Sequence, residues 1–374
     1  MVNANASSNS TQTNAVYGRQ IAFTAAFLLP ASKLLEVPSL LAKYAAGDLL
    51  VPALLHFLLQ GLVLWGILFA VSKSQLPLFE RLKNALGKWS NIFYALFAVY
   101  YVLAAVLPIL DFEKFVYAAF FDTEPTVFAF AFFFILSAFI CMKGIKSVGR
   151  CADLCLFLFL LPFFALMFMS LTETDFTRLL PLFGTKFGDS FQAFQYTIPH
   201  FSDVVLLLPL LGNYSYKKGD SVKITLGYSF GAALTLFFLA VFFGTYSSIS
   251  PRVHYAFSNI AQYFPALSVI GRIDLIFVYL LSIVLLFYTC LPLLYTTEYL
   301  SVLFKTEQKL LFSTLLNATM FAFTLFFNKY YNSIYNIFTS YLPLVFIFIA
   351  DMVVLFFIFL PKNPKEKLHA KHAR

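Results

Sequence analysis

Residues 197–203 read Thr197-Ile198-Pro199-His200-Phe201-Ser202-Asp203, and they interrupt an apolar stretch that extends over residues 190–212. Another apolar stretch, residues 20–41, contains Leu29-Pro30-Ala31-Ser32-Lys33 at a comparable depth. Proline removes a helical hydrogen bond, and the freed backbone groups persist in a bilayer only where they line a cavity or contact protein. Paired interruptions are typical of a transporter binding site. The alternative is that Pro30 and Pro199 only kink their helices, since membrane helices tolerate proline.

The composition around these stretches is that of an integral membrane protein. Of the 374 residues, 60% are hydrophobic and 12% are charged, and the mean hydropathy is +0.81. A soluble domain has about 25% charged residues. A soluble enzyme is therefore excluded. The net charge of +8 comes from short clusters between apolar runs, so no nucleic-acid partner is expected.

Ten apolar stretches are long enough to cross a bilayer core of about 30 Å as helices. We expect an all-α membrane fold with ten transmembrane helices near residues 20–41, 48–72, 90–111, 125–142, 152–171, 190–212, 222–247, 270–297, 308–327 and 335–360.

Lys and Arg are concentrated in alternate connections. They follow the second, fourth, sixth and eighth stretches and flank both ends of the set. Because cytoplasmic loops carry the excess of positive residues, both termini are predicted to be cytoplasmic. Residues 1–18 and 361–374 are then a cytoplasmic N-terminal tail and a basic cytoplasmic C-terminal tail.

Ten spans divide into two sets of five, residues 19–171 and residues 172–360. An odd number of spans in each set gives the sets opposite orientations in the membrane. The sequence therefore predicts a five-plus-five inverted repeat in which the first and sixth helices are broken.

Ionisable residues near the two interruptions are candidate site residues, because a charge at bilayer depth is costly unless it faces a cavity or a partner. Lys33 either meets an anionic ligand group or takes the place of a coupling cation. Alternatively, it pairs with Glu36 on one helical face, or snorkels to the interface. His200 and Asp203 are comparable candidates, and Asp351 has no visible partner in the sequence.

Motifs of catalysis are absent from the sequence, which has no Walker loop, no HExxH, no nucleophile elbow and no dinucleotide-binding glycine pattern. We therefore expect no enzyme activity, no cofactor and no metal site. The four cysteines lack zinc or disulfide spacing and are expected to be buried thiols.

Several short motifs resemble, in order, those of the spore germination permease family, which supplies the B subunit of nutrient germinant receptors. They are Gln20, the segment from Pro38 to Asp48, the segment from Lys143 to Asp153, Leu179-Leu180-Pro181-Leu182-Phe183, and Arg272-Ile273-Asp274. The resemblance covers nearly the whole chain.

The resemblance implies an amino acid/polyamine/organocation-type permease with a LeuT-like fold in the inner membrane of an endospore. It also implies a small nutrient ligand, typically an amino acid, and two protein partners, a membrane-embedded A subunit and a C-subunit lipoprotein. The family's pocket maps here onto Pro30, Ala31, Ser32, Ile198, Pro199 and His200. The family usually has glycine at the first break. The Ala31-Ser32-Lys33 found here favours either another nutrient or a cation-free site in which Lys33 replaces an ion.

Other functions remain open from sequence alone. An ordinary secondary transporter of amino acids or organic cations would use the same pocket without partner subunits. A bare ion or water channel would conduct without saturable binding, and a membrane enzyme is the least supported of the alternatives.

Overall fold

The computed structural model describes residues 16–74, 76–120, 126–181, 183–262, 274–306, 308–338 and 340–361. Within these residues the chain is helical, and its one β-type pairing is an isolated bridge between Val16 and Tyr214. The predicted tails lie almost entirely outside the described residues, as do the beginning of the predicted eighth span and Arg272 and Ile273 of the motif that opens it. The division into two five-helix sets stays a prediction here.

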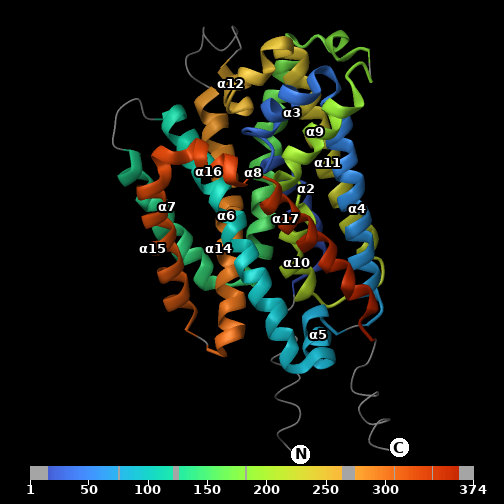
Figure 1. Cartoon of the computed structure of the whole chain (residues 1–374), viewed down its shortest axis with the longest axis vertical. Helices are drawn as coiled ribbons and strands as arrows, with labels where there is room; N and C mark the ends of the chain where they lie inside the picture. Colours follow the sequence, from blue (N-terminus) through green and yellow to red (C-terminus); the bar gives the residue numbers. More distant parts are fainter. Residues whose placement is uncertain are drawn as a thin grey trace, which may run out of the picture.

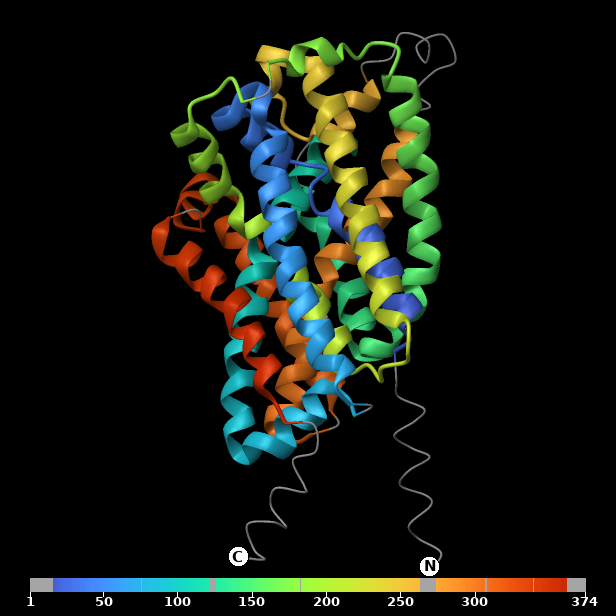
Figure 2. The same ribbon diagram turned by 90° about the vertical axis from the view of Figure 1, so that its right-hand side faces the viewer.

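The helices form a bundle that is elongated in one direction (Figures 1 and 2). In chain order they are α2 (Gly18–Ala31), α3 (Val37–Ala45), α4 (Leu50–Ser72), α5 (Leu78–Leu86), α6 (Ser90–Phe120), α7 (Thr126–Lys143), α8 (Ile145–Ser170), α9 (Phe187–Thr197), α10 (Asp203–Gly212), α11 (Asp220–Tyr246), α12 (Ala256–Gln262), α14 (Asp274–Phe304), α15 (Lys309–Phe327), α16 (Tyr331–Phe338) and α17 (Tyr341–Val353).

Six helical segments among the described residues are long and apolar enough to cross a membrane. They are Leu50–Ser72, Leu78–Ala118, Ile145–Ser170, Asp220–Arg252, Leu275–Phe304 and Lys309–Phe338, and two shorter apolar helices are Phe130–Lys143 and Leu344–Phe359. Each of the predicted second, third, fifth, seventh, eighth and ninth stretches overlaps one of the six long segments, and the fourth overlaps the shorter helix Phe130–Lys143.

Both predicted interruptions are present. The first stretch consists of α2 and α3, and residues 32–36 between them are not helical. The sixth stretch consists of α9, a short 3-10 turn at Ile198–His200, and α10.

The predicted tenth span is wrong at its beginning. Residue 335 lies inside α16, which ends at Phe338, and a separate helix, α17, begins at Tyr341. Ser340 has an extended backbone, and Pro343 in the first turn of α17 cannot donate a hydrogen bond to a preceding helical turn. A hydropathy window of about 19 residues is longer than this break, so it does not separate the end of α16 from the beginning of α17.

Helices α2 and α11 pack closely against each other, and Figure 2 shows them as a dark blue helix behind a yellow one. Gly227 and Gly231 of α11 face the backbone of α2. A Cβ atom on Gly231 would lie 2.8 Å from the carbonyl oxygen of Ala25, and one on Gly227 would overlap the carbonyl of Ala22. Small residues at this spacing let membrane helices approach closely.

The Lys-rich connections meet at the end of the bundle that contains α5, whereas α3, α9 and α12 lie at the opposite end (Figure 1). A cavity of about 420 Å³ at the α5 end is lined by Lys143, Lys146 and Lys309 among other residues. Glu298 lies in the same cavity wall and accepts hydrogen bonds of 2.7 and 2.8 Å from Lys309. The connections that are rich in Lys and Arg, which alternate along the sequence with connections that are poor in them, therefore lie together at one end of the molecule.

Arg81 is fully buried at this end, although in sequence it is one of the loop charges. Its Nη1 donates to the carbonyl of Ala70 at 2.6 Å, its Nη2 to Leu360 at 3.1 Å and its Nε to Pro361 at 3.4 Å. A single guanidinium thus joins the end of α4 to the segment that follows α17.

We expect Arg81→Met to lower the free energy of unfolding by about 2 kcal/mol, because buried carbonyl groups lose charged donors. Thermal unfolding of the purified protein in detergent measures the change, and Arg150→Met, at an exposed position, is the control. Equal melting temperatures for the two variants would contradict a stabilising role for Arg81.

Candidate functional site

The two helix interruptions are joined by a buried ion pair. Lys33 follows the end of α2, and Asp203 is the first residue of α10. The Nζ of Lys33 lies 2.6 Å from Oδ1 of Asp203, and their side chains are 0% and 1% exposed. The first and sixth apolar stretches therefore meet at their non-helical segments.

The groups around Lys33 offset the free-energy cost of burying its charge. Its ammonium also donates to the hydroxyl of Ser32 at 2.8 Å and lies 4.8 Å from the centre of the Phe201 ring. Hydrogen bonds to a charge and the face of an aromatic ring both stabilise a desolvated ammonium.

Two alternatives for Lys33 are wrong. Glu36 is not its partner and instead accepts a hydrogen bond of 2.9 Å from the hydroxyl of Tyr331. The helix ends before Lys33, so the two residues do not share a helical face. Lys33 also does not snorkel, because its side chain is wholly buried.

Gln60 of α4 links the second interruption to α17, and it is not among the predicted site residues. Its carbonyl oxygen accepts from the backbone N–H of Val204 at 3.2 Å, which satisfies one of the free donors at the start of α10. Its amide nitrogen donates to Asp351 at 2.8 Å. A glutamine in an apolar helix was the only signal that could have revealed it.

His56 is buried and packs against aromatic side chains. It lies between the rings of Phe194 and Phe201, with ring centres 4.0 and 4.4 Å away, and its Nε2 is 2.9 Å from the hydroxyl of Thr197. The aromatic stack holds α4 against both sides of the second interruption.

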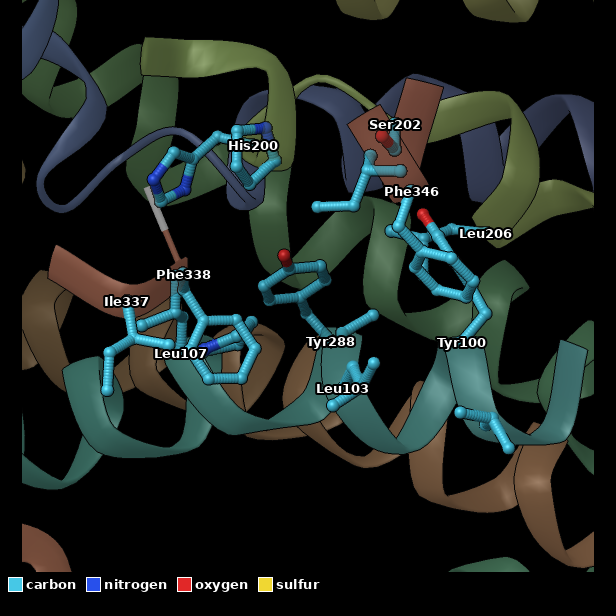
Figure 3. Close-up of a pocket in the computed structure, with 15 residues that line it drawn as sticks. Tyr100, Leu103, Leu107, His200, Ser202, Leu206, Tyr288, Ile337, Phe338 and Phe346 are labelled. Carbon is cyan, nitrogen blue, oxygen red and sulfur yellow. The ribbon is translucent and has the colours of Figure 1, made fainter. Parts of the chain in front are cut away.

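A cavity of about 440 Å³ adjoins the second interruption (Figure 3). Pro199, His200 and Ser202 form part of its wall, and Tyr100 and Tyr288 supply hydroxyl groups. The rest of the lining is apolar and includes Leu103 and Leu107 of α6, Leu206 of α10, Ile337 and Phe338 of α16, and Phe346 of α17. Figure 3 shows Leu103 and Leu107 on the side opposite His200 and Ser202. The volume and the mainly apolar lining of this cavity are typical of a site that binds a small molecule.

A second cavity of about 20 Å³, enough for one water molecule, extends to the first interruption. Ala31 and Ser32 line it, and His200 and Tyr288 are common to both cavities. The Nε2 atom of His200 is buried and has no hydrogen-bond partner among the described residues.

The predicted site residues thus fall into three groups. Lys33 and Asp203 form the ion pair, and Ala31, Ser32, Pro199 and His200 line the cavities. Pro30 lies in the last turn of α2 and Ile198 in the 3-10 turn, and neither lines these two cavities. Among the described residues, no three His, Cys, Asp or Glu side chains are grouped so that they could hold a metal ion.

The fold is similar to that of solved membrane transporters. Three mutants of the manganese transporter from Eremococcus coleocola each match with a TM-score of 0.58, covering 92% of this chain and 79% of theirs. Sequence identity is 13% for two of them and 14% for the third. Together with the apolar helices, this similarity defines a multi-pass membrane protein with the fold of a transporter.

The particular family follows from the sequence match. A sequence model of the spore germination proteins matches residues 23–332, and the chain belongs to this permease family. No curated protein matches the chain. The family and the structural relatives point to transport rather than to catalysis.

Proposed function

We propose that this chain is a permease-like subunit that binds a small nutrient between the interruptions of the first and sixth spans. The observation that carries the proposal is the Lys33–Asp203 ion pair, which joins the two interruptions close to a cavity of about 440 Å³. An ion pair this deeply buried is stable only in a fixed geometry. A ligand in the adjoining cavity could therefore favour one arrangement of the two broken helices over another.

The proposed architecture is ten spans in a five-plus-five inverted repeat of the LeuT-like type. Packing supports it, because α4 contacts α11, α6 contacts α14 and α7 contacts α15. An inverted repeat makes the two members of each of these pairs equivalent. In this arrangement α2 with α3 corresponds to α9 with α10, and the paired interruptions fall at equivalent places.

The proposed setting is a nutrient germinant receptor in the inner membrane of the endospore, with both chain termini cytoplasmic. The ligand class is an amino acid, and the partners are an A subunit and a C-subunit lipoprotein. Membership of the spore germination family supports this setting. The Lys33–Asp203 pair supports a cation-free site, since the lysine ammonium occupies the position in which a coupling cation would neutralise Asp203.

The second candidate function is secondary transport, and the fold shared with the manganese transporter favours it. The two functions differ in flux. A transporter accumulates radiolabelled ligand in proteoliposomes, whereas a receptor subunit binds the ligand without net uptake.

Filling the cavity tests the proposed site. Leu107 lines the cavity and is 4% exposed, so Leu107→Trp is expected to abolish saturable binding of a radiolabelled amino acid panel to the purified protein. Leu58→Trp, on the outer surface of α4, is the matched control and should bind as wild type does. Normal binding by Leu107→Trp, with correct folding verified by thermal unfolding, would place the ligand elsewhere.

A further inference from the structure

Asp351 of α17 is a buried carboxylate that has no cationic partner among the described residues. It is 3% exposed, and its Oδ2 accepts hydrogen bonds from two neutral groups, the amide of Gln60 at 2.8 Å and the hydroxyl of Ser202 at 3.4 Å. Its other oxygen, Oδ1, is buried and makes no hydrogen bond with any described residue. A buried charge normally has a counterion, because desolvation without one is costly.

The charges around the second interruption do not balance. Lys33 lies directly against Asp203 and supplies one positive charge, whereas Asp203 and Asp351 carry two negative charges when both are ionised. Oδ2 of Asp203 is also buried without a hydrogen bond among the described residues. One monovalent cation beside Asp351 would complete the balance.

This carboxylate lies beside the large cavity. Ser202 lines the cavity and contacts Asp351, and Ile347, another lining residue, precedes Asp351 by one helical turn. Tyr100 and Phe346 line the same region, and their ring centres are 6.3 Å apart (Figure 3). Aromatic faces near a carboxylate favour a cation over a neutral group.

The other residues that line the cavity indicate the chemical character of the rest of the ligand. Leu103, Leu107, Leu206, Ile337 and Phe338 present an apolar wall. A small hydrated ion would leave this wall in contact with water, whereas an organic cation would cover it.

We infer that Asp351 recognises the ammonium group of an organic ligand with a large apolar body, such as an apolar amino acid or its amine. This inference rests on the proposed function, since it assigns a ligand class to the same cavity. The ammonium supplies the missing positive charge, and the apolar body fills the space between α6, α16 and α17.

Matched probes test the ammonium on the unaltered protein. Binding of radiolabelled L-phenylalanine and L-leucine to the full chain in detergent is measured in competition with phenethylamine and with 3-phenylpropionate. Phenethylamine, which keeps the ammonium, is expected to compete, and 3-phenylpropionate, which lacks it, is not. Binding should be the same in sodium and in choline buffers. Competition by 3-phenylpropionate alone, or a strict need for sodium, would overturn the inference.

Asp351→Asn tests the carboxylate. Loss of one partner of a buried charge pair predicts at least about a 30-fold lower affinity for the ammonium probes. Its melting temperature without ligand should be equal to or above that of wild type, because an uncompensated charge is removed. Asp153→Asn, a half-exposed acid on α8, is the control.

The outcomes separate this inference from the proposed function. If Leu107→Trp loses binding and Asp351→Asn binds as wild type does, Asp351 carries no ligand charge and the inference fails while the cavity stands. If both variants bind normally, or no probe binds the wild type, the ligand class and the site fail together.

Discussion

Replacing Lys33 with methionine is expected to destabilise the protein by about 3–5 kcal/mol, since removal of one partner of a buried ion pair leaves an uncompensated charge. Asp203 is 1% exposed, and its carboxylate would lose the ammonium with which it is paired. The measurement is thermal unfolding in detergent, with Lys143→Met at an exposed position as the control. A melting temperature equal to that of the control would contradict a buried charge at Asp203.

The double variant Lys33→Met/Asp203→Leu distinguishes a structural pair from a functional one. Replacing a whole buried ion pair with apolar side chains of similar volume is often neutral or stabilising. Much of the stability lost in Lys33→Met should therefore return. Ligand binding should not return, because the charges that join the two interruptions are absent. Recovery of both stability and binding would show that the pair has no role in the site.

The spans and their interruptions were predictable because local features of the sequence determine them. Apolar length fixes where a helix can cross the bilayer, and prolines 30 and 199 fix where the backbone loses its regular hydrogen bonds. Asp351 was also identifiable as a buried charge, since few acids occur within apolar stretches. The beginning of the tenth span was predicted wrongly although a signal was present, because α16 contains Asn332, Ser333 and Asn336 and is less apolar than the helix that follows it.

The pairing of side chains could not be derived from the sequence. Lys33 and Asp203 are 170 positions apart, and the nearer acid, Glu36, was the obvious candidate for the lysine. Which partner is chosen depends on how α2 packs against α10 and α11, and contacts between such distant segments are not visible in the local sequence. Gln60 was missed for the same reason, because its two hydrogen bonds reach α10 and α17.

The close contact of α2 with α11 determines where Lys33 lies. Gly227 and Gly231 have the Gly-x-x-x-Gly spacing of close membrane-helix packing, a signal that was present in the sequence. Because α2 ends just before Lys33, a displacement of α2 would also displace the ammonium from Asp203. The close packing of Gly227 and Gly231 against α2 therefore affects the distance between Lys33 and Asp203.

Gly227→Ala is accordingly expected to destabilise the protein by about 3 kcal/mol, since the new methyl group would overlap the backbone carbonyl of Ala22 and a backbone cannot move aside as a flexible side chain can. Gly61→Ala on α4 is the matched control. Its new Cβ would lie 3.6 Å from the nearest atom, the ring of Tyr228, and the gain in helix propensity should leave stability unchanged or raise it by about 0.5–1 kcal/mol. Thermal unfolding of both variants, with binding of the same amino acid panel, gives the comparison. If Gly227→Ala melts and binds like Gly61→Ala, then α2 can move away from α11 without disturbing Lys33, and the two interruptions are held together by the ion pair alone.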